Sequence, residues 1–377
     1  MVTPTSRRAF LMGRRTAATP FEQFCARLER TCLGSVRAAP SNAHSAQAPQ
    51  AWLKPVRLED VAHARALCQE YRVALMLEGG EPPNARTQAT LWVSPQPAGA
   101  TLSLVDLQAG VWRADAGCTV AQLKETGVFA ELDLPPELTL AQWFAWPETV
   151  RGKILGAARR DETPSPGKPW ETGEREGGCE LGSSMPDAVR IVECAEVLLA
   201  DGTVEVLGPF GATAQAPLRS LTLQRLVPKL FELAGSDAAQ RCAQATPWPA
   251  CYRLDALIAT ATHEPNLAQL LFGHQGSLGW VQALWLKRLD PVFDPQPSEQ
   301  DVERDRERNR GQVRGRDAAQ DEASTRQFEG GMIAKKEGER APLLQLASHL
   351  DQELKHILDP LGVFGSNSHL KGLESSY

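Results

Sequence analysis

The chain has 377 residues, enough for one large domain or two smaller ones, with an ordinary globular balance of 42% hydrophobic and 23% charged residues. Its formal net charge of −6 argues against a general affinity for nucleic acid or anionic membrane. No apolar run approaches the roughly 20 residues of a membrane span. Eight scattered cysteines, without a CxxC pair or a common metal spacing, indicate reduced thiols in a cytosolic protein and predict no metal site.

The N-terminal residues contain a motif that resembles a twin-arginine export signal. In "TSRRAFLM", residues 5–12, the two arginines are followed by charged and polar residues instead of the apolar h-region that such a signal needs. We therefore expect a cytoplasmic protein and keep export as the alternative.

A helix and a linker are predicted for residues 1–50. The stretch "TPFEQFCARLERTCLG", residues 19–34, has a threonine cap, an early proline and apolar residues three or four apart, which is typical of a helix. Residues 35–50 are rich in alanine, proline, serine and glutamine, and this composition indicates a linker.

A strand, a helix at about residues 58–71 and a second strand, "VALML", are predicted next, and they end in the glycine turn Gly79–Pro83. "TLWVS" and "LSLVDL" have the composition of short strands. "GVWRADAGCTVAQLKETG" then predicts a strand, a glycine turn and a threonine-capped helix. The segment from 51 to 291 therefore begins with alternating strands and helices.

The second half of that segment is predicted to hold a hairpin, a helix and a final strand. Residues 187–211 form the hairpin, with an Asp-Gly turn at its tip. "LQRLVPKLFELAG" predicts a helix that its proline starts or kinks. In "LLFGHQGSLGWVQALWLKRL", residues 270–289, a glycine-rich turn leads into a long apolar strand.

Charged residues of both signs crowd into residues 298–340, with few apolar residues among them. This composition cannot cover a core, so residues 292–342 are predicted to be a disordered or solvent-exposed segment. The interleaved acids argue against a basic nucleic-acid tail. Residues 343–377 are predicted to form a C-terminal helix, which ends at an Asp-Pro pair, and a tail.

Taken in order, these motifs resemble the FAD-binding domain of the vanillyl-alcohol oxidase / PCMH-type flavoproteins, and within that family the glycolate oxidase FAD-binding subunits. The resemblance covers roughly residues 50 to 290 and the last ~30 residues. The segments that carry it are "LEGGEPP" at 77–83, "AGC" at 116–118, "VLLADG" at 197–202, "GHQGSLG" at 273–279 and "LDPLGVFGSN" at 358–367.

The resemblance implies an α+β fold, namely a PCMH-type two-subdomain FAD-binding domain at 51–291. The charged segment lies where the family has its substrate cap, so the cap is expected to be rudimentary or missing. The positions implied as FAD-binding are Gly79, Gly80, Glu81, Gly117, Gly152, Gly156, Ser183, Ser184, Asp187, Ile191, Gly273 and Gly276. A glycine turn can offer several backbone N–H groups to a pyrophosphate. A plain turn at each glycine, and a core position for Ile191, are the structural alternatives.

The function that the resemblance implies is that of an FAD-linked oxidoreductase, or its flavin subunit, which passes a hydride from a substrate such as a 2-hydroxy acid to the flavin. No histidine follows Gly79 and Gly80, so FAD is expected to be noncovalent. A small-molecule substrate is implied, and a partner flavoprotein or iron–sulfur subunit is compatible with it. The catalytic residues are unknown. His274 alone among the histidines lies in a family motif; its ring could meet a ligand there, but a surface position is the commoner case and is expected for it. The alternative is a non-catalytic relative that acts as a binding or assembly subunit.

Overall fold

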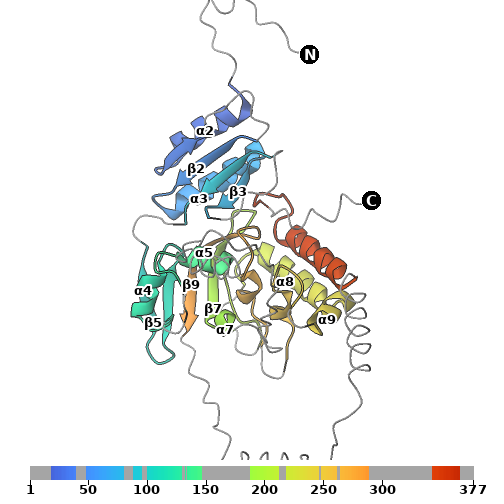
Figure 1. Cartoon of the computed structure of the whole chain (residues 1–377). Coiled ribbons are helices and arrows are strands. Elements are labelled where there is room, and N and C mark those ends of the chain that lie inside the picture. Colours follow the sequence, from blue (N-terminus) through green and yellow to red (C-terminus); the bar gives the residue numbers. More distant parts are fainter. Residues whose placement is uncertain are drawn as a thin grey trace, which may run out of the picture.

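The computed structural model describes the chain in several ranges, and all structural statements below refer to them: residues 18–39, 48–79, 88–95, 100–129, 132, 134–146, 187–211, 218–245, 248–260, 264–287 and 342–365. Two separate sheets with flanking helices make up these ranges (Figure 1). The α+β class and the two-subdomain arrangement predicted from the sequence are confirmed. The predicted charged segment, residues 292–342, lies outside the described residues except for residue 342.

The first subdomain is a four-stranded sheet with two helices. Its elements are α2 (Pro20–Thr31), β1 (Ser35–Ala38), β2 (Gln50–Lys54), α3 (Leu58–Tyr71), β3 (Ala74–Leu77) and β4 (Thr90–Val93). The strand order is β1-β2-β4-β3, with β2, β4 and β3 parallel and β1 antiparallel to β2. Every residue of β3 and β4 is buried, as expected for parallel strands covered on both faces.

Strand β1 corrects the predicted linker at 35–50. Ser35 pairs with Lys54 and Ala38 pairs with Ala51 across the edge of the sheet. The four residues of β1 are mostly exposed and do not alternate between apolar and polar, so no local pattern predicts a strand. The pairing is therefore made by backbone hydrogen bonds to β2, which a composition-based prediction does not detect.

The buried carboxylate of Asp60, in α3, ties the loops on either side of β1 and β2 together. It is 0% exposed and accepts hydrogen bonds from the backbone N–H groups of Leu33, Gly34 and Val56, each at 3.0 Å. Three loop donors with no partner in a helix or sheet are thus satisfied by one side chain.

The second subdomain is an antiparallel five-stranded sheet. Its elements are β5 (Leu102–Asp106), β6 (Val111–Asp115), α4 (Val120–Glu125), α5 (Leu140–Ala145), α7 (Asp187–Arg190), β7 (Val192–Leu198), β8 (Val204–Leu207) and β9 (Trp280–Lys287). The order is β5-β6-β9-β7-β8, so the last strand within the described ranges occupies the centre. The hairpin predicted at 187–211 is confirmed for β7 and β8, but its first residues form the helical turn α7 instead of strand.

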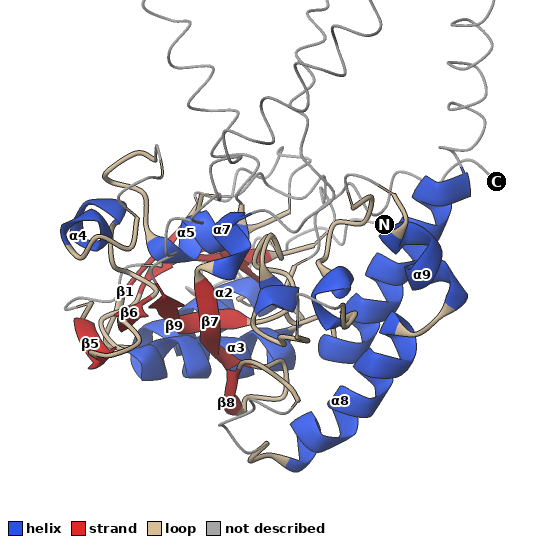
Figure 2. Ribbon diagram, turned by 90° about the horizontal axis from the view of Figure 1, so that it is seen from below, coloured by secondary structure: helices blue, strands red, loops and turns tan. Residues whose placement is uncertain are grey.

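Helices gather on one side of this second sheet. They are α8 (Leu221–Ala234), α9 (Asp237–Ala243), the 3-10 turns η1 (Leu254–Leu257) and η2 (Gln269–Leu271), and a C-terminal helix at 342–358. Figure 2 shows α8 and α9 together, away from α4 and β5. Pro228 lies inside α8, which Ser220 caps, so the proline does not start that helix.

The C-terminal residues return to the first sheet. The helix ends at residue 358, just before the Asp-Pro pair, as predicted. Leu75 of β3 then forms a parallel bridge with Phe364, and the Leu75 N–H donates to the carbonyl of Val363 at 2.9 Å. Residues 363–364 thereby extend the first sheet beside β3, while the helix before them packs on the second subdomain (Figure 1).

Candidate functional site

The short helix α5 lies where the two subdomains meet, and the sequence analysis missed it. Thr139 caps it in a reciprocal capping box with Gln142, and five of its six residues are buried. The signal was present: "TLAQ" at 139–142 repeats the pattern of "TVAQ" at 119–122, which caps α4 in the same way. The helix was missed because it is short, and not because it lacks a capping motif.

Gly117 lies beside the first turn of α5. The N–H of Ala141 donates to the carbonyl of Ala116 at 2.9 Å, and the N–H of Leu140 donates to the carbonyl of Cys118 at 2.8 Å. Two donors from the first turn of α5 are therefore satisfied by the backbone on both sides of Gly117.

The glycine turn 273–279 lies against the other end of α5. The N–H groups of Gly273 and Gln275 donate to the carbonyls of Phe144 and Ala145, at 2.8 and 3.0 Å. Gly273, Gln275 and Gly276 all have positive φ, at 80°, 56° and 75°. The turn uses a left-handed backbone, which glycine tolerates best, to bring its N–H groups to the carbonyl end of the helix.

At Gly79 and Gly276 the first sheet comes close to α5 and to the glycine turn. A Cβ at Gly276 would lie 3.1 Å from Cβ of Leu77, and a Cβ at Gly79, where φ is +110°, would lie 2.7 Å from Nε2 of Gln142. The same Gln142 amide donates to the carbonyl of Glu78 at 3.3 Å. The structure thus gathers Gly79, Gly117, Gly273 and Gly276 around α5.

The other predicted FAD-binding positions do not join this group. Ile191 is buried, and its carbonyl accepts from Lys287 at the end of β9 opposite the turn, roughly 20 Å along an eight-residue strand. Asp187 begins α7. Outside the described residues lie Gly80, Glu81, Gly152, Gly156, Ser183 and Ser184.

The surface position expected for His274 is wrong. Its side chain is 3% exposed, and its ring centroid lies 5.8 Å from that of Phe144 in α5. Burial and the nearby Lys355 ammonium lower the pKa of His274 to about 3, so the imidazole is neutral at physiological pH. The residues that cover it come from distant parts of the chain, and for this reason no local pattern predicted its burial.

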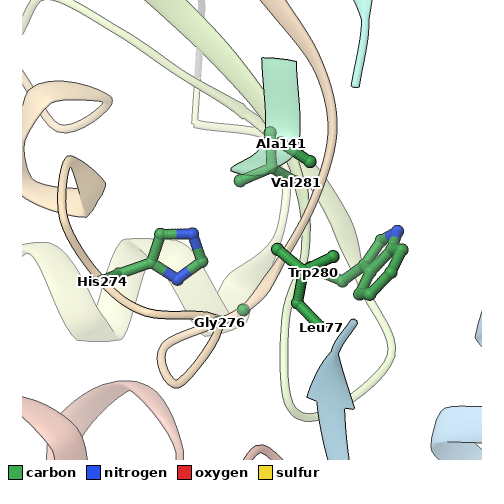
Figure 3. Close-up of a pocket in the computed structure, with 7 residues that line it drawn as sticks. Leu77, Ala141, His274, Gly276, Trp280 and Val281 are labelled. Carbon is green, nitrogen blue, oxygen red and sulfur yellow. The ribbon is translucent and has the colours of Figure 1, made fainter. Parts of the chain in front are cut away.

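A small cavity lies beside His274, between the two subdomains. Leu77 of β3, Ala141 of α5 and Val281 of β9 contribute to its wall, with Gly276 at its edge (Figure 3). Its volume is about 10 Å³, about the room of one water molecule.

Lys355 of the C-terminal helix and Tyr252 make polar contacts with the glycine turn 273–279. The Lys355 ammonium donates to the carbonyls of Ser277 and Phe364 and to the Asp359 carboxylate. The hydroxyl of Tyr252 lies 2.7 Å from Oγ of Ser277, which in turn donates to the carbonyl of His274. Burial lowers the pKa of Lys355, and the Asp359 carboxylate opposes that shift.

The described residues do not fit a flavin ring at this junction. The space next to Gly79, Gly276 and Gly279 is filled by Gln142, Leu77 and Val197 of the chain itself. The cavity is also far smaller than the several hundred Å³ of a cofactor pocket. At the described junction Gly79, Gly276 and Gly279 therefore allow close packing of the chain against itself.

Neither a metal site nor a membrane span is found within the described ranges. No three metal-ligating side chains come together there, and every cysteine in them is a free thiol. None of the helices in these ranges combines the length and apolar character needed to cross a bilayer.

Comparisons with known proteins give a partial likeness to solved structures. No protein-family model matches the chain, and no curated protein matches its sequence. Two crystal forms of alkyldihydroxyacetonephosphate synthase resemble it at 12% identity and TM-scores of 0.33 and 0.31, over 64% of this chain and 32% of the synthase. A variant of Physcomitrella patens BBE-like 1 does so at 11% identity and a TM-score of 0.34, over 70% of this chain and 44% of that protein. The chain thus spans less than half of these proteins, and likenesses at such TM-scores establish neither family nor activity.

Proposed function

We propose that the chain is an FAD-binding protein of the PCMH type, either an FAD-linked oxidoreductase or the flavin subunit of one. The supporting observation is that glycine turns nearly 200 residues apart, at Gly79 and Gly276, meet on α5 between two sheets, and Gly117 joins them there. Ligand sites favour such junctions between domains. The order of the motifs along the chain is the second support.

In this proposal the flavin contacts fall on residues outside the described ranges that follow Gly79 and α5 in the sequence. Gly80 and Glu81 follow Gly79 directly, and Gly152 and Gly156 follow α5. The proposed substrate is a 2-hydroxy acid such as glycolate, and none of the described contacts bears on this choice. No catalytic residue is assigned, because the described junction holds no space for the flavin beside its side chains.

The purified full-length chain provides the test. We expect FAD to copurify and to be released by acid or heat, because no histidine follows Gly79 to hold it covalently. The measurement is the absorbance spectrum before and after denaturation, with added FAD titrated by fluorescence. A colourless protein that also fails to bind added FAD contradicts the proposal, and flavin retained on denatured protein contradicts noncovalent binding.

A second candidate function is that of a non-catalytic relative that acts as a binding or assembly subunit. The filled space at Gly79, Gly276 and Gly279 favours it, since packing alone then explains these glycines. The same spectrum separates the two candidates. An assembly subunit is expected to be colourless and to show no turnover of 2-hydroxy acids with an artificial electron acceptor.

A further inference from the structure

The space next to Gly79 is closed by the end of a flexible side chain, whereas the space at Gly276 is closed by atoms of a strand. A Cβ at Gly79 would lie 2.7 Å from Nε2 of Gln142, which is a terminal atom of that side chain. At Gly276 the nearest atoms are Cβ and the backbone nitrogen of Leu77, at 3.1 and 3.5 Å. Of these two spaces, only the one at Gly79 is opened by rotating a side chain.

The Gln142 amide makes few contacts at this place. Gln142 is the one residue of α5 that is not buried. Its Nε2 donates to the Glu78 carbonyl at 3.3 Å, slightly longer than the usual range for such a bond. Its Oε1 accepts from the N–H and the hydroxyl of Thr139, at 3.2 and 3.0 Å. Turning the amide away from Gly79 therefore breaks one long hydrogen bond and disturbs the cap of α5.

The backbone at Gly79 is accessible from solvent. Gly79 is exposed and Glu78 is half-buried, so a ligand reaches the glycine once the amide has turned away. The φ of +110° at Gly79 favours glycine, which leaves the backbone open to close approach.

The Glu78 carbonyl selects the kind of group that enters. It loses its donor when the Gln142 amide turns away, so an entering hydroxyl or N–H restores the hydrogen bond. The oxygens of a pyrophosphate only accept hydrogen bonds, and they would face the lone pairs of this carbonyl. The position therefore suits a neutral hydrogen-bond donor.

We propose that the Gln142 amide is a movable group that closes a ligand position at Gly79, and that this position takes a hydroxyl or N–H group of the ligand. The inference rests on the proposed function, in which the ligand is FAD. It assigns a neutral donor group of FAD, and not its pyrophosphate, to the Glu78 carbonyl. The amide turns away when FAD binds, whereas Leu77 stays against Gly276.

Titration of FAD into the full-length chain, followed by fluorescence, tests the ligand position. Gln142→Ala removes the amide and should bind FAD about 2- to 10-fold more tightly than the wild type, because no hydrogen bond has to be broken. Gln122→Ala is the matched control, since Gln122 caps α4 with Thr119 in the same way. It should leave the affinity unchanged. A crystal structure of the FAD complex should show a hydroxyl or N–H bonded to the Glu78 carbonyl.

Urea unfolding tests the movement of the amide without FAD. Gly79→Ala places a Cβ against the amide, and its cost is compared in the wild type and in Gln142→Ala. The strain of positive φ is the same in both backgrounds. The extra loss in the wild-type background measures the cost of turning the amide, and it should be about tenfold or less in the unfolding equilibrium constant.

Two results overturn the proposal. One is an FAD affinity that Gln142→Ala leaves unchanged or raises no more than Gln122→Ala does, or a phosphate at the Glu78 carbonyl. The proposed flavin function then stands without this position. The other is an extra loss far above tenfold, which would show that the amide cannot turn away. If FAD binds to none of these proteins, the proposed function fails, and the unfolding comparison still decides whether the amide moves.

Discussion

Gly276 illustrates at the residue scale how backbone conformation and packing act on one position. Its φ is +75°, and a Cβ there would lie 3.1 Å from Cβ of Leu77. Gly110 has a similar φ of +63° but open space around it. The two glycines therefore share the conformational strain of a substitution and differ only in the contact.

Gly276→Ala and Gly110→Ala are the matched pair that separates these effects. We expect both to destabilise the chain by about 1 kcal/mol through positive φ, and Gly276→Ala to lose about 1–2 kcal/mol more through the contact with Leu77. Urea unfolding of both variants measures the difference. Equal losses would show that the turn does not press on β3.

Asp60 is the second residue whose environment makes a sharp prediction. Burial alone would raise its pKa, but the N–H groups of Val56 and Leu33 and the Arg57 guanidinium outweigh burial and hold it below its ordinary value. An acid with a lowered folded pKa contributes stability above its unfolded pKa of about 3.9, and this contribution is lost as pH falls through the folded pKa.

Asp60→Asn should therefore destabilise the chain at pH 7 by about 1–3 kcal/mol, since it weakens three hydrogen bonds to a buried carboxylate. The loss should shrink as the pH falls below about 4, because Asp60 is then protonated in the unfolded chain, and at still lower pH in the folded chain, so that its charge contributes less to the stability of the wild type. Urea unfolding at pH 7 and pH 3 measures both values. A loss that is the same at both values of pH would assign the effect to shape and not to charge.

At the scale of elements, the C-terminal helix is the part that joins the two subdomains to the glycine turn. Lys355 reaches Ser277 on one side and Phe364 on the other, and Asp351 accepts from the backbone N–H groups of Cys251 and Tyr252, each at 2.9 Å. The helix therefore stabilises the region around His274 by polar contacts as well as apolar ones.

Lys355→Met should destabilise the chain by about 3–5 kcal/mol, because the Asp359 carboxylate loses its buried cation and two carbonyls lose a donor. Lys229→Met, at an exposed position on α8, is the control and should change stability by less than about 0.5 kcal/mol. Thermal or urea unfolding measures both. A small effect at Lys355 would mean that the helix is held by its apolar face alone.

For the whole molecule, the charged segment 298–340 is the largest feature with no expected part in the core. Its few apolar residues could bury little surface, so its deletion should leave the melting temperature nearly unchanged. Differential scanning calorimetry of the shortened chain measures this. A loss of several degrees would show that the segment packs as a domain and would contradict the prediction of a missing cap.

Most helices and strands could be predicted because their signals are local. Thr19 with Glu22 and Thr119 with Gln122 cap their helices through contacts three residues apart, and Asp201-Gly202 turns the hairpin within itself. The glycine turn was also predictable, since glycine readily adopts the positive φ found at Gly273 and Gly276. These features determined the α+β class and the order of the elements along the chain.

Only the tertiary structure decided which of these turns meet and what surrounds them. β1 exists because β2 lies beside it, and His274 is buried because Phe144 and the C-terminal helix cover it. Four predicted glycines meet on α5, whereas Ile191 lies at the far end of β9. Such contacts join residues far apart in the chain, and their free energy comes from burial and pairing that no single stretch of sequence contains.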